Sequence, residues 1–108
     1  MRKTRFLDKE KVIAKLSKLA KKAKGKNRNI LHVILFGSLV NNTYTAASDA
    51  DILVILKRDS SRFMDRIPDL LYLFADAPLP VDVFPYTEQE SRSIPFARKA
   101  MERGIILA

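Results

Sequence analysis

Residues 30–56 read ILHVILFGSLVNNTYTAASDADILVIL, two apolar runs separated by a small and polar stretch. The first run, residues 30–36, is rich in branched side chains and ends at Gly37, which predicts a buried central strand. The second run predicts another strand at about residues 50–57. The stretch between them predicts a turn in which Ser38 begins one helical turn. These two strands are the centre of the predicted fold.

Helical patterns are found outside this pair of strands. Apolar residues recur at helical spacing through residues 12–23, with Asp8 as the expected N-cap and Gly25 as the expected end of the helix. A second helix is predicted within residues 63–74, and Pro68 requires that it is either kinked or starts late.

The last third of the chain predicts one more strand and one more helix. Residues 81–84 form a short strand that Pro85 is expected to end, and residues 88–103 form a helix interrupted near its proline. Residues 105–107 add a final strand or dock as an apolar tail. The element order predicts a single α/β domain over residues 1–108, a small two-layer fold in which a mixed sheet is flanked by helices.

Composition narrows the function classes. The 108-residue chain has no cysteine, which removes disulfides, thiolate chemistry and cysteine-ligated metals. It has no apolar run near 18 residues, and its basic N-terminus is followed by no apolar stretch, so neither a membrane span nor a secretory signal is expected. The only histidine, His32, has no second histidine with which to form a metal site. We expect an intracellular, cytoplasmic protein.

The net charge of +8 is concentrated in one segment. Residues 1–28 carry a balance of +10, whereas residues 29–108 carry −2. A patch of this sign attracts phosphates, nucleic acid or an acidic partner protein. The same charges are also compatible with the solvated face of a helix.

Three aspartates interrupt otherwise apolar strands. Asp49 and Asp51 are two residues apart, so their carboxylates point to the same face of the second strand. Asp82 points away from the valines on either side of it, and it joins the pair if its strand lies beside the second strand. Such carboxylates repel one another unless a cation neutralises them. Mg²⁺ prefers oxygen ligands, and two ions about 4 Å apart can support an in-line phosphoryl displacement.

Gly37-Ser38 is the other candidate element, because glycine allows close approach of a ligand and the N–H groups and hydroxyl can cradle phosphate. Each piece has a plain alternative. Gly-Ser can be only a turn, Asp-x-Asp can cap or face solvent, and Asp82 can be a solvated edge residue. Together, however, Gly-Ser, ten residues and Asp-x-Asp arise by chance in about one chain of this size in a thousand.

The stretch from Gly37-Ser38 to Ser48-Asp49-Ala50-Asp51, followed by a later carboxylate at Asp82, resembles the signature of the DNA polymerase beta nucleotidyltransferase superfamily. More narrowly, it resembles the minimal nucleotidyltransferases that are often paired with a HEPN-domain partner. The resemblance covers roughly residues 8–104.

That resemblance implies a polymerase beta-like fold and a role for each residue. Gly37 and Ser38 would bind the triphosphate, Asp49 and Asp51 would hold two Mg²⁺ ions, and Asp82 would complete the metal site and help to activate the acceptor hydroxyl. The chain departs from the pattern in one place. Many members carry Arg-Gly where this sequence has Asn41-Asn42, which removes a phosphate or ion-pair contact.

Three functions are consistent with these observations. The leading hypothesis is Mg²⁺-dependent transfer of a nucleoside monophosphate, AMP from ATP, onto a hydroxyl such as a tyrosine of a HEPN toxin. The second is a catalytically degenerate antitoxin module that binds its partner, supported by Asn41-Asn42 and by the apolar residues 105–107. The third, nucleic-acid binding through residues 1–28, ranks last because residues 7–28 contain no aromatic side chain for stacking on bases.

Overall fold

The computed structural model describes residues 8–43 and 48–108. Its centre is a mixed sheet of four strands in the order β3-β2-β1-β4. Strand β1 (Ile30–Phe36) is antiparallel to β2 (Ala50–Leu56) and to β4 (Ile105–Ile106), whereas β3 (Val81–Thr87) runs parallel to β2. The predicted mixed sheet flanked by helices is therefore confirmed, with the strand of residues 30–36 at its centre.

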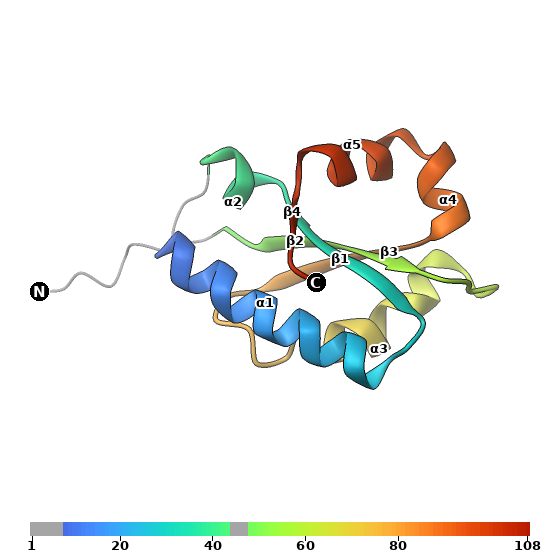
Figure 1. Ribbon diagram of the computed structural model, residues 1–108, viewed down its shortest axis with the longest axis horizontal. Helices are drawn as coiled ribbons and strands as arrows, with labels where there is room; N and C mark the ends of the chain where they lie inside the picture. The colour runs from blue at the N-terminus through green and yellow to red at the C-terminus, as the bar shows by residue number, and fades with distance from the viewer. Residues whose placement is uncertain (1–7, 44–47) are drawn as a thin grey trace, which may run out of the picture.

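Helices cover both faces of the sheet (Figure 1). Helices α1 (Lys9–Lys26) and α3 (Ile67–Tyr72) lie on one face, and α4 (Glu88–Ser93) and α5 (Pro95–Arg103) lie on the other. The short helix α2 (Ser38–Asn41) follows β1 directly. No helix in the described part of the chain is both long and apolar enough to cross a bilayer.

The alternation of side chains along the strands produces two cores. On the α1 and α3 face, Val33, Leu35, Ile52 and Val54 are buried against the apolar stripe of α1. On the α5 face lies a smaller cluster of buried residues, which comprises Ile34, Leu53, Ile55, Ala97 and Ala100. Because successive strand residues point to opposite faces, the odd-numbered residues of β2 from Asp51 onward point to the α5 face.

Helix α1 begins as the sequence predicts and ends later. The Asp8 carboxylate accepts a hydrogen bond from the Lys11 amide at 3.2 Å, which caps the first turn. The predicted end at Gly25 is wrong, because the helix continues to Lys26 and Asn27 donates to the Ala23 carbonyl at 2.8 Å. Gly25 therefore lies inside the helix and does not cap it, and Asn27 is the C-cap residue.

Pro85 does not end β3, contrary to the sequence prediction. The strand continues to Thr87 because β3 is an edge strand, paired only with β2. The Pro85 carbonyl accepts a hydrogen bond from Arg66 Nη1 at 3.2 Å. The nitrogen and carbonyl of a strand residue point to the same side, so the missing N–H of Pro85 faces the open edge and costs no sheet hydrogen bond.

The remaining helical predictions are confirmed in outline. Pro68 occupies the first turn of α3, after a 3₁₀ turn over Phe63–Arg66, so this helix starts late. The last helix is broken at Pro95, and Gly104 caps it. In the tail at residues 105–107, Ile105–Ile106 forms β4 and Leu107 is buried, so only Ile106 presents a large exposed side chain there.

Candidate active site

The sheet brings two of the three aspartates into one row. Asp51 on β2 is the register partner of Asp82 on β3, and Phe36 on β1 is the partner of Asp51. Neighbours in register point their side chains to the same face, so Phe36, Asp51 and Asp82 form one line across the α5 face of the sheet. The register therefore places Asp51 and Asp82 side by side on one face of the sheet, as the sequence predicts.

Asp49 lies one residue before β2, exposed, and belongs to the same end of the sheet. Asp51 is half-buried, and its pKa lies above the ordinary value because burial removes water from the carboxylate and because Asp82 and Asp49 repel its charge. The Asp51 carboxylate therefore interacts with both of the others. The start of β2 is held beside β3 by a hydrogen bond from the Ala50 amide to the Pro80 carbonyl at 2.8 Å.

The donor types at this end of the sheet fit a hard divalent cation. Carboxylate oxygens are the ligands that Mg²⁺ prefers, and a cation would offset the repulsion that raises the pKa of Asp51. The side chains are not gathered into a finished site, however. Across residues 8–43 and 48–108, no three His, Cys, Asp or Glu side chains are close enough together to form a ready-made metal cluster.

Gly37 lies directly against the Asp51 carboxylate. Its φ is +84° and its ψ is −148°, a backbone conformation that residues other than glycine rarely adopt. A Cβ atom at this position would collide with a carboxylate oxygen of Asp51 and would lie 3.3 Å from its Cγ. The sequence predicts close approach of a ligand at this glycine, and the structure shows close approach of the aspartate itself. Ser38 then begins α2 at the same corner.

The departure at Asn41-Asn42 takes a specific structural form. Asn42 has a left-handed backbone, with φ of 59°, a conformation that asparagine adopts more readily than most residues and that glycine adopts freely. The ammonium of Lys9 donates to the Asn42 side chain at 2.7 Å, so a cation from α1 lies beside this turn. Tyr44, which belongs to the stretch between the two central strands, is outside the described residues.

Sequence reasoning missed an aromatic cluster next to the carboxylates. The ring centroids of Phe36 and Phe84 are 5.3 Å apart, and each lies 5.4 Å from that of Phe96 on α5. One signal was present in the sequence, because Phe84 follows Asp82 by two residues and so shares its face. The contribution of Phe96 could not be read from the sequence, since it depends on how α5 crosses the sheet.

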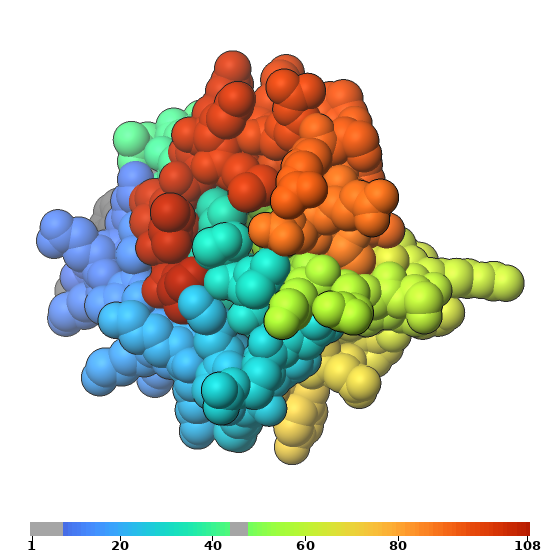
Figure 2. Space-filling model, turned by 45° about the vertical axis from the view of Figure 1, so that its right-hand side comes forward, coloured from blue at the N-terminus to red at the C-terminus, as the bar shows by residue number. Residues whose placement is uncertain are grey.

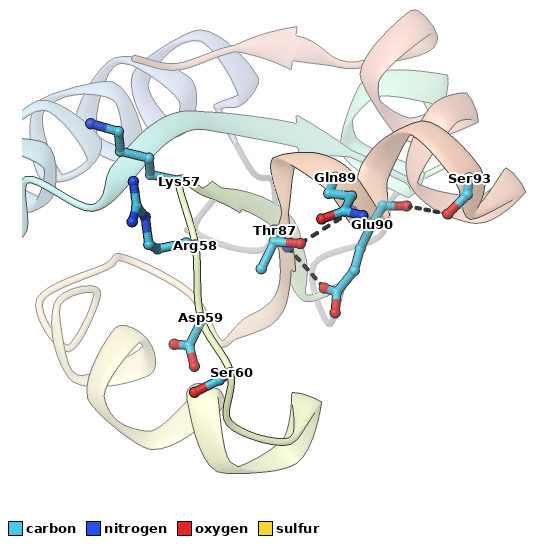
Figure 3. Close-up of a pocket in the computed structure, with 8 residues that line it drawn as sticks. All are labelled: Lys57, Arg58, Asp59, Ser60, Thr87, Gln89, Glu90 and Ser93. Carbon is cyan, nitrogen blue, oxygen red and sulfur yellow. Dashed lines mark hydrogen bonds between the residues drawn. The ribbon is translucent and has the colours of Figure 1, made fainter.

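A broad pocket of about 830 Å³ lies at the opposite end of the sheet (Figure 3). It is formed where β2 and β3 end, with Lys57 and Arg58 on one side and Thr87 and Glu90 on the other. Glu90 is already engaged there, since it accepts from the Thr87 amide at 2.9 Å and from Arg66 Nη1 at 2.7 Å. None of the aspartates of the candidate site lines this pocket, and we assign it no function.

Two solved structures have a similar fold. One is a candidate nucleotidyltransferase from Sulfolobus solfataricus, with a TM-score of 0.64 and 19% sequence identity over 91% of this chain and 80% of that chain. The other is a toxin–antitoxin structure with AMP-PNP, with a TM-score of 0.60 and 23% identity over 85% of this chain and 72% of that chain. No curated protein matches the chain.

These likenesses define the class of fold, the mixed α/β fold of polymerase beta-like nucleotidyltransferases. A family model described as a nucleotidyltransferase domain matches residues 16–107, which is most of the chain. The chain therefore belongs to the nucleotidyltransferase domain family.

Proposed function

We propose that this protein is a Mg²⁺-dependent nucleotidyltransferase that transfers AMP from ATP to a hydroxyl group. The observation that carries the proposal is the row formed by Asp51 and Asp82 on neighbouring parallel strands, directly beside Gly37. Membership of the nucleotidyltransferase domain family supports the same reaction class. Carboxylates that repel one another and are partly desolvated lower the stability of the folded chain. A bound cation that offsets this loss of stability would explain why they are present.

Each residue has a proposed role. Asp49 and Asp51 hold two Mg²⁺ ions, with Asp82 as the third carboxylate of the site. Gly37 and Ser38 bind the triphosphate through backbone N–H groups and the serine hydroxyl. Bound Mg²⁺ would neutralise phosphate charge and polarise the reacting phosphoryl group.

The proposed transfer needs no other co-reactant. The oxygen of the acceptor hydroxyl forms a bond to the α-phosphorus of ATP, and the bond from that phosphorus to the α,β-bridging oxygen breaks, so pyrophosphate leaves. Asp82 is exposed, so its carboxylate is open to an incoming acceptor and suited to accept the hydroxyl proton. Asp51 is half-buried and is repelled by Asp82 and Asp49, so a bound cation would stabilise its charge, which suits it to metal binding.

We propose a partner protein as the acceptor, with a tyrosine of a HEPN toxin as the specific candidate. The toxin–antitoxin structure with AMP-PNP, which shares this fold, supports a search in that direction.

Label transfer tests the proposal. The purified chain is mixed with Mg²⁺, a candidate HEPN-domain partner protein, and ATP labelled at either the α- or the γ-phosphate. We expect the partner to gain the α-label and not the γ-label, and we expect Asp49→Ala/Asp51→Ala to abolish transfer. Transfer of the γ-label would indicate a kinase. The proposal would be overturned if no label is transferred and if the double variant still protects cells from the toxin as well as the unaltered chain does.

A second candidate is a partner-binding antitoxin that has lost turnover. Two observations favour it: the carboxylates are not gathered into a metal cluster in the described part of the chain, and Asn41-Asn42 replaces the Arg-Gly of many relatives. Neutralisation of the toxin by the Asp49→Ala/Asp51→Ala variant as effectively as by the unaltered chain would favour this second function over the first.

A further inference from the structure

Three phenylalanine rings from separate elements meet on the α5 face of the sheet. Phe36 and Phe84 meet edge-to-face at an interplanar angle of 65°, and Phe36 and Phe96 do so at 83°. The Phe84 and Phe96 rings are tilted by 48°. Strands β1 and β3 are not neighbours, so the rings of Phe36 and Phe84 reach each other over β2. We call these three residues the aromatic wall.

The aromatic wall lies next to the proposed carboxylate site. Phe36 is in register with Asp51, and Phe84 follows Asp82 by two residues on the same face. Phe36 is also the residue immediately before Gly37. One edge of the wall is therefore continuous with the turn proposed to bind the triphosphate and with the row of aspartates.

Phe96 on α5 contacts the rings of Phe36 and Phe84, and its ring centroid also lies 6.4 Å from that of Tyr86, two residues beyond Phe84 on β3. Its ring contacts Phe36, the last residue of β1, whereas the next residue of the helix, Ala97, is fully buried in the core. Phe96 nevertheless stays 45% exposed. A phenylalanine used only for packing is usually buried, so an exposed ring backed by two others leaves π surface available to a ligand. In Figure 2, the orange and red atoms that include α4 and α5 lie side by side in the upper part of the view.

Two cations share this side of α5. Lys99 and Arg103 follow Phe96 at i+3 and i+7, so they lie along the same side of the helix, and both are exposed. Within residues 8–43 and 48–108, neither forms an ion pair. A ligand that matches this side of α5 carries a planar ring together with negative charge, as a nucleotide does.

We propose that the aromatic wall, through the exposed ring of Phe96, binds the base of the nucleoside triphosphate. This inference rests on the proposed function and specifies its substrate. Rings read the face of a base and not its hydrogen-bonding edge. The wall therefore favours purine over pyrimidine triphosphates by stacking area and discriminates little between ATP and GTP.

Calorimetric titration tests this inference with the unaltered chain and four variants. The ligands are α,β-methylene-ATP, whose α–β bond resists cleavage, and inorganic tripolyphosphate, which lacks the base, each with excess Mg²⁺. Phe96→Ala removes the ring, and Phe96→Trp keeps one. Met101→Ala is the matched control, because Met101 is an apolar residue of α5 that is 37% exposed and lies on another side of the helix. Asp51→Asn reports on the carboxylate site.

We expect Phe96→Ala to weaken binding of the ATP analogue about tenfold or more and to leave tripolyphosphate binding within about twofold. Phe96→Trp restores the affinity, and Met101→Ala leaves both ligands unaffected. Unchanged affinity of Phe96→Ala for the analogue, with binding that still requires Asp51, overturns the inference and leaves the proposed function intact. Equal losses for both ligands also overturn it, because the ring would then act only on the fold. If the unaltered chain binds neither ligand, the proposed function fails as well.

Discussion

At the scale of single residues, Asp51 links stability to the proposed function. It is half-buried, it faces Asp82 in register, and its pKa is raised by burial and by the neighbouring carboxylates. The folded protein without a cation therefore holds a charge that it stabilises poorly. Residues of this kind are typical of functional sites, where stability is lower than the fold would otherwise allow.

We expect Asp51→Asn to raise the free energy of unfolding by about 0.5–2 kcal/mol at neutral pH without Mg²⁺, because the amide keeps the shape and removes the repelled charge. Urea denaturation with and without Mg²⁺ checks this, since added Mg²⁺ should stabilise the unaltered chain and not the variant. A loss of stability in Asp51→Asn without Mg²⁺ would show that the carboxylate makes a favourable contact.

Gly37 gives a second prediction at the residue scale. Gly37→Ala should destabilise the protein by about 1–3 kcal/mol, because φ is +84° and the new Cβ meets the Asp51 carboxylate. Gly25→Ala is the control, since Gly25 lies within α1 with nothing near its Cβ position. It should stabilise by up to about 1 kcal/mol. Equal effects of the two substitutions in urea denaturation would contradict the close approach at Gly37.

Much of this residue-scale picture could be predicted from the sequence. Period-2 geometry alone places Asp49 and Asp51 on one face, and the flanking valines place Asp82. Whether Asp82 meets Asp51 depends on β3 pairing with β2, which the sequence leaves open. The aromatic wall was out of reach for the same reason, because Phe36 and Phe96 are 60 residues apart in the chain and meet only through the fold.

At the scale of elements, Arg66 joins the 3₁₀ turn, β3 and α4. Its side chain is 5% exposed, pairs with Glu90 Oε1 at 2.7 Å and donates to the carbonyls of Pro85 and Ser61. Glu90 also completes a capping box with Thr87 at the start of α4. These contacts hold the edge strand in place beyond Pro85. The sequence offers no signal for the pair, since 24 residues separate Arg66 from Glu90.

The Arg66–Glu90 pair predicts a specific pH dependence of stability. Hydrogen bonds from Arg66 lower the pKa of Glu90 from an ordinary 4.5 to about 2. Since the folded state binds this proton less readily than the unfolded state, the stabilisation is complete above about pH 4.5 and is lost as the pH falls towards 2. Glu90→Gln should therefore cost about 1–3 kcal/mol at pH 7 and progressively less below pH 4.5.

Glu88→Gln is the matched control, because Glu88 lies on the same helix and pairs with Arg92 at 3.7 Å on the surface. It should change the free energy of unfolding by less than about 1 kcal/mol. Thermal or urea denaturation between pH 2 and pH 7 compares the two. A cost of Glu90→Gln that stays constant down to pH 2 would rule out the ion pair as its source.

The boundaries of the elements show where local patterns stop being sufficient. Capping residues and prolines in the sequence correctly predict the starts of α1 and α3 and the break before α5. The same rules ended α1 too early at Gly25 and β3 too early at Pro85. In β3 the tertiary setting decides, because an edge strand tolerates a proline that a central strand does not.

At the scale of the whole molecule, the basic helix and the candidate site occupy different faces. Helix α1 covers one face of the sheet, whereas the aspartates and α5 belong to the other (Figure 1). Lysines at residues 11, 15, 18, 22 and 26 form one exposed stripe along α1, spaced by three or four residues. A partner held by that stripe would leave the site free to bind a nucleotide.

The central claim is that the aspartates bind a Mg²⁺–triphosphate complex, and calorimetric titration with α,β-methylene-ATP tests it most directly. Asp51→Asn and Asp82→Asn are compared with Asp76→Asn, which alters an exposed aspartate outside the site. We predict binding that requires Mg²⁺, falls at least about tenfold in the first two variants and is unchanged in the third. Equal affinity in all three variants, or binding that does not depend on Mg²⁺, would contradict the account.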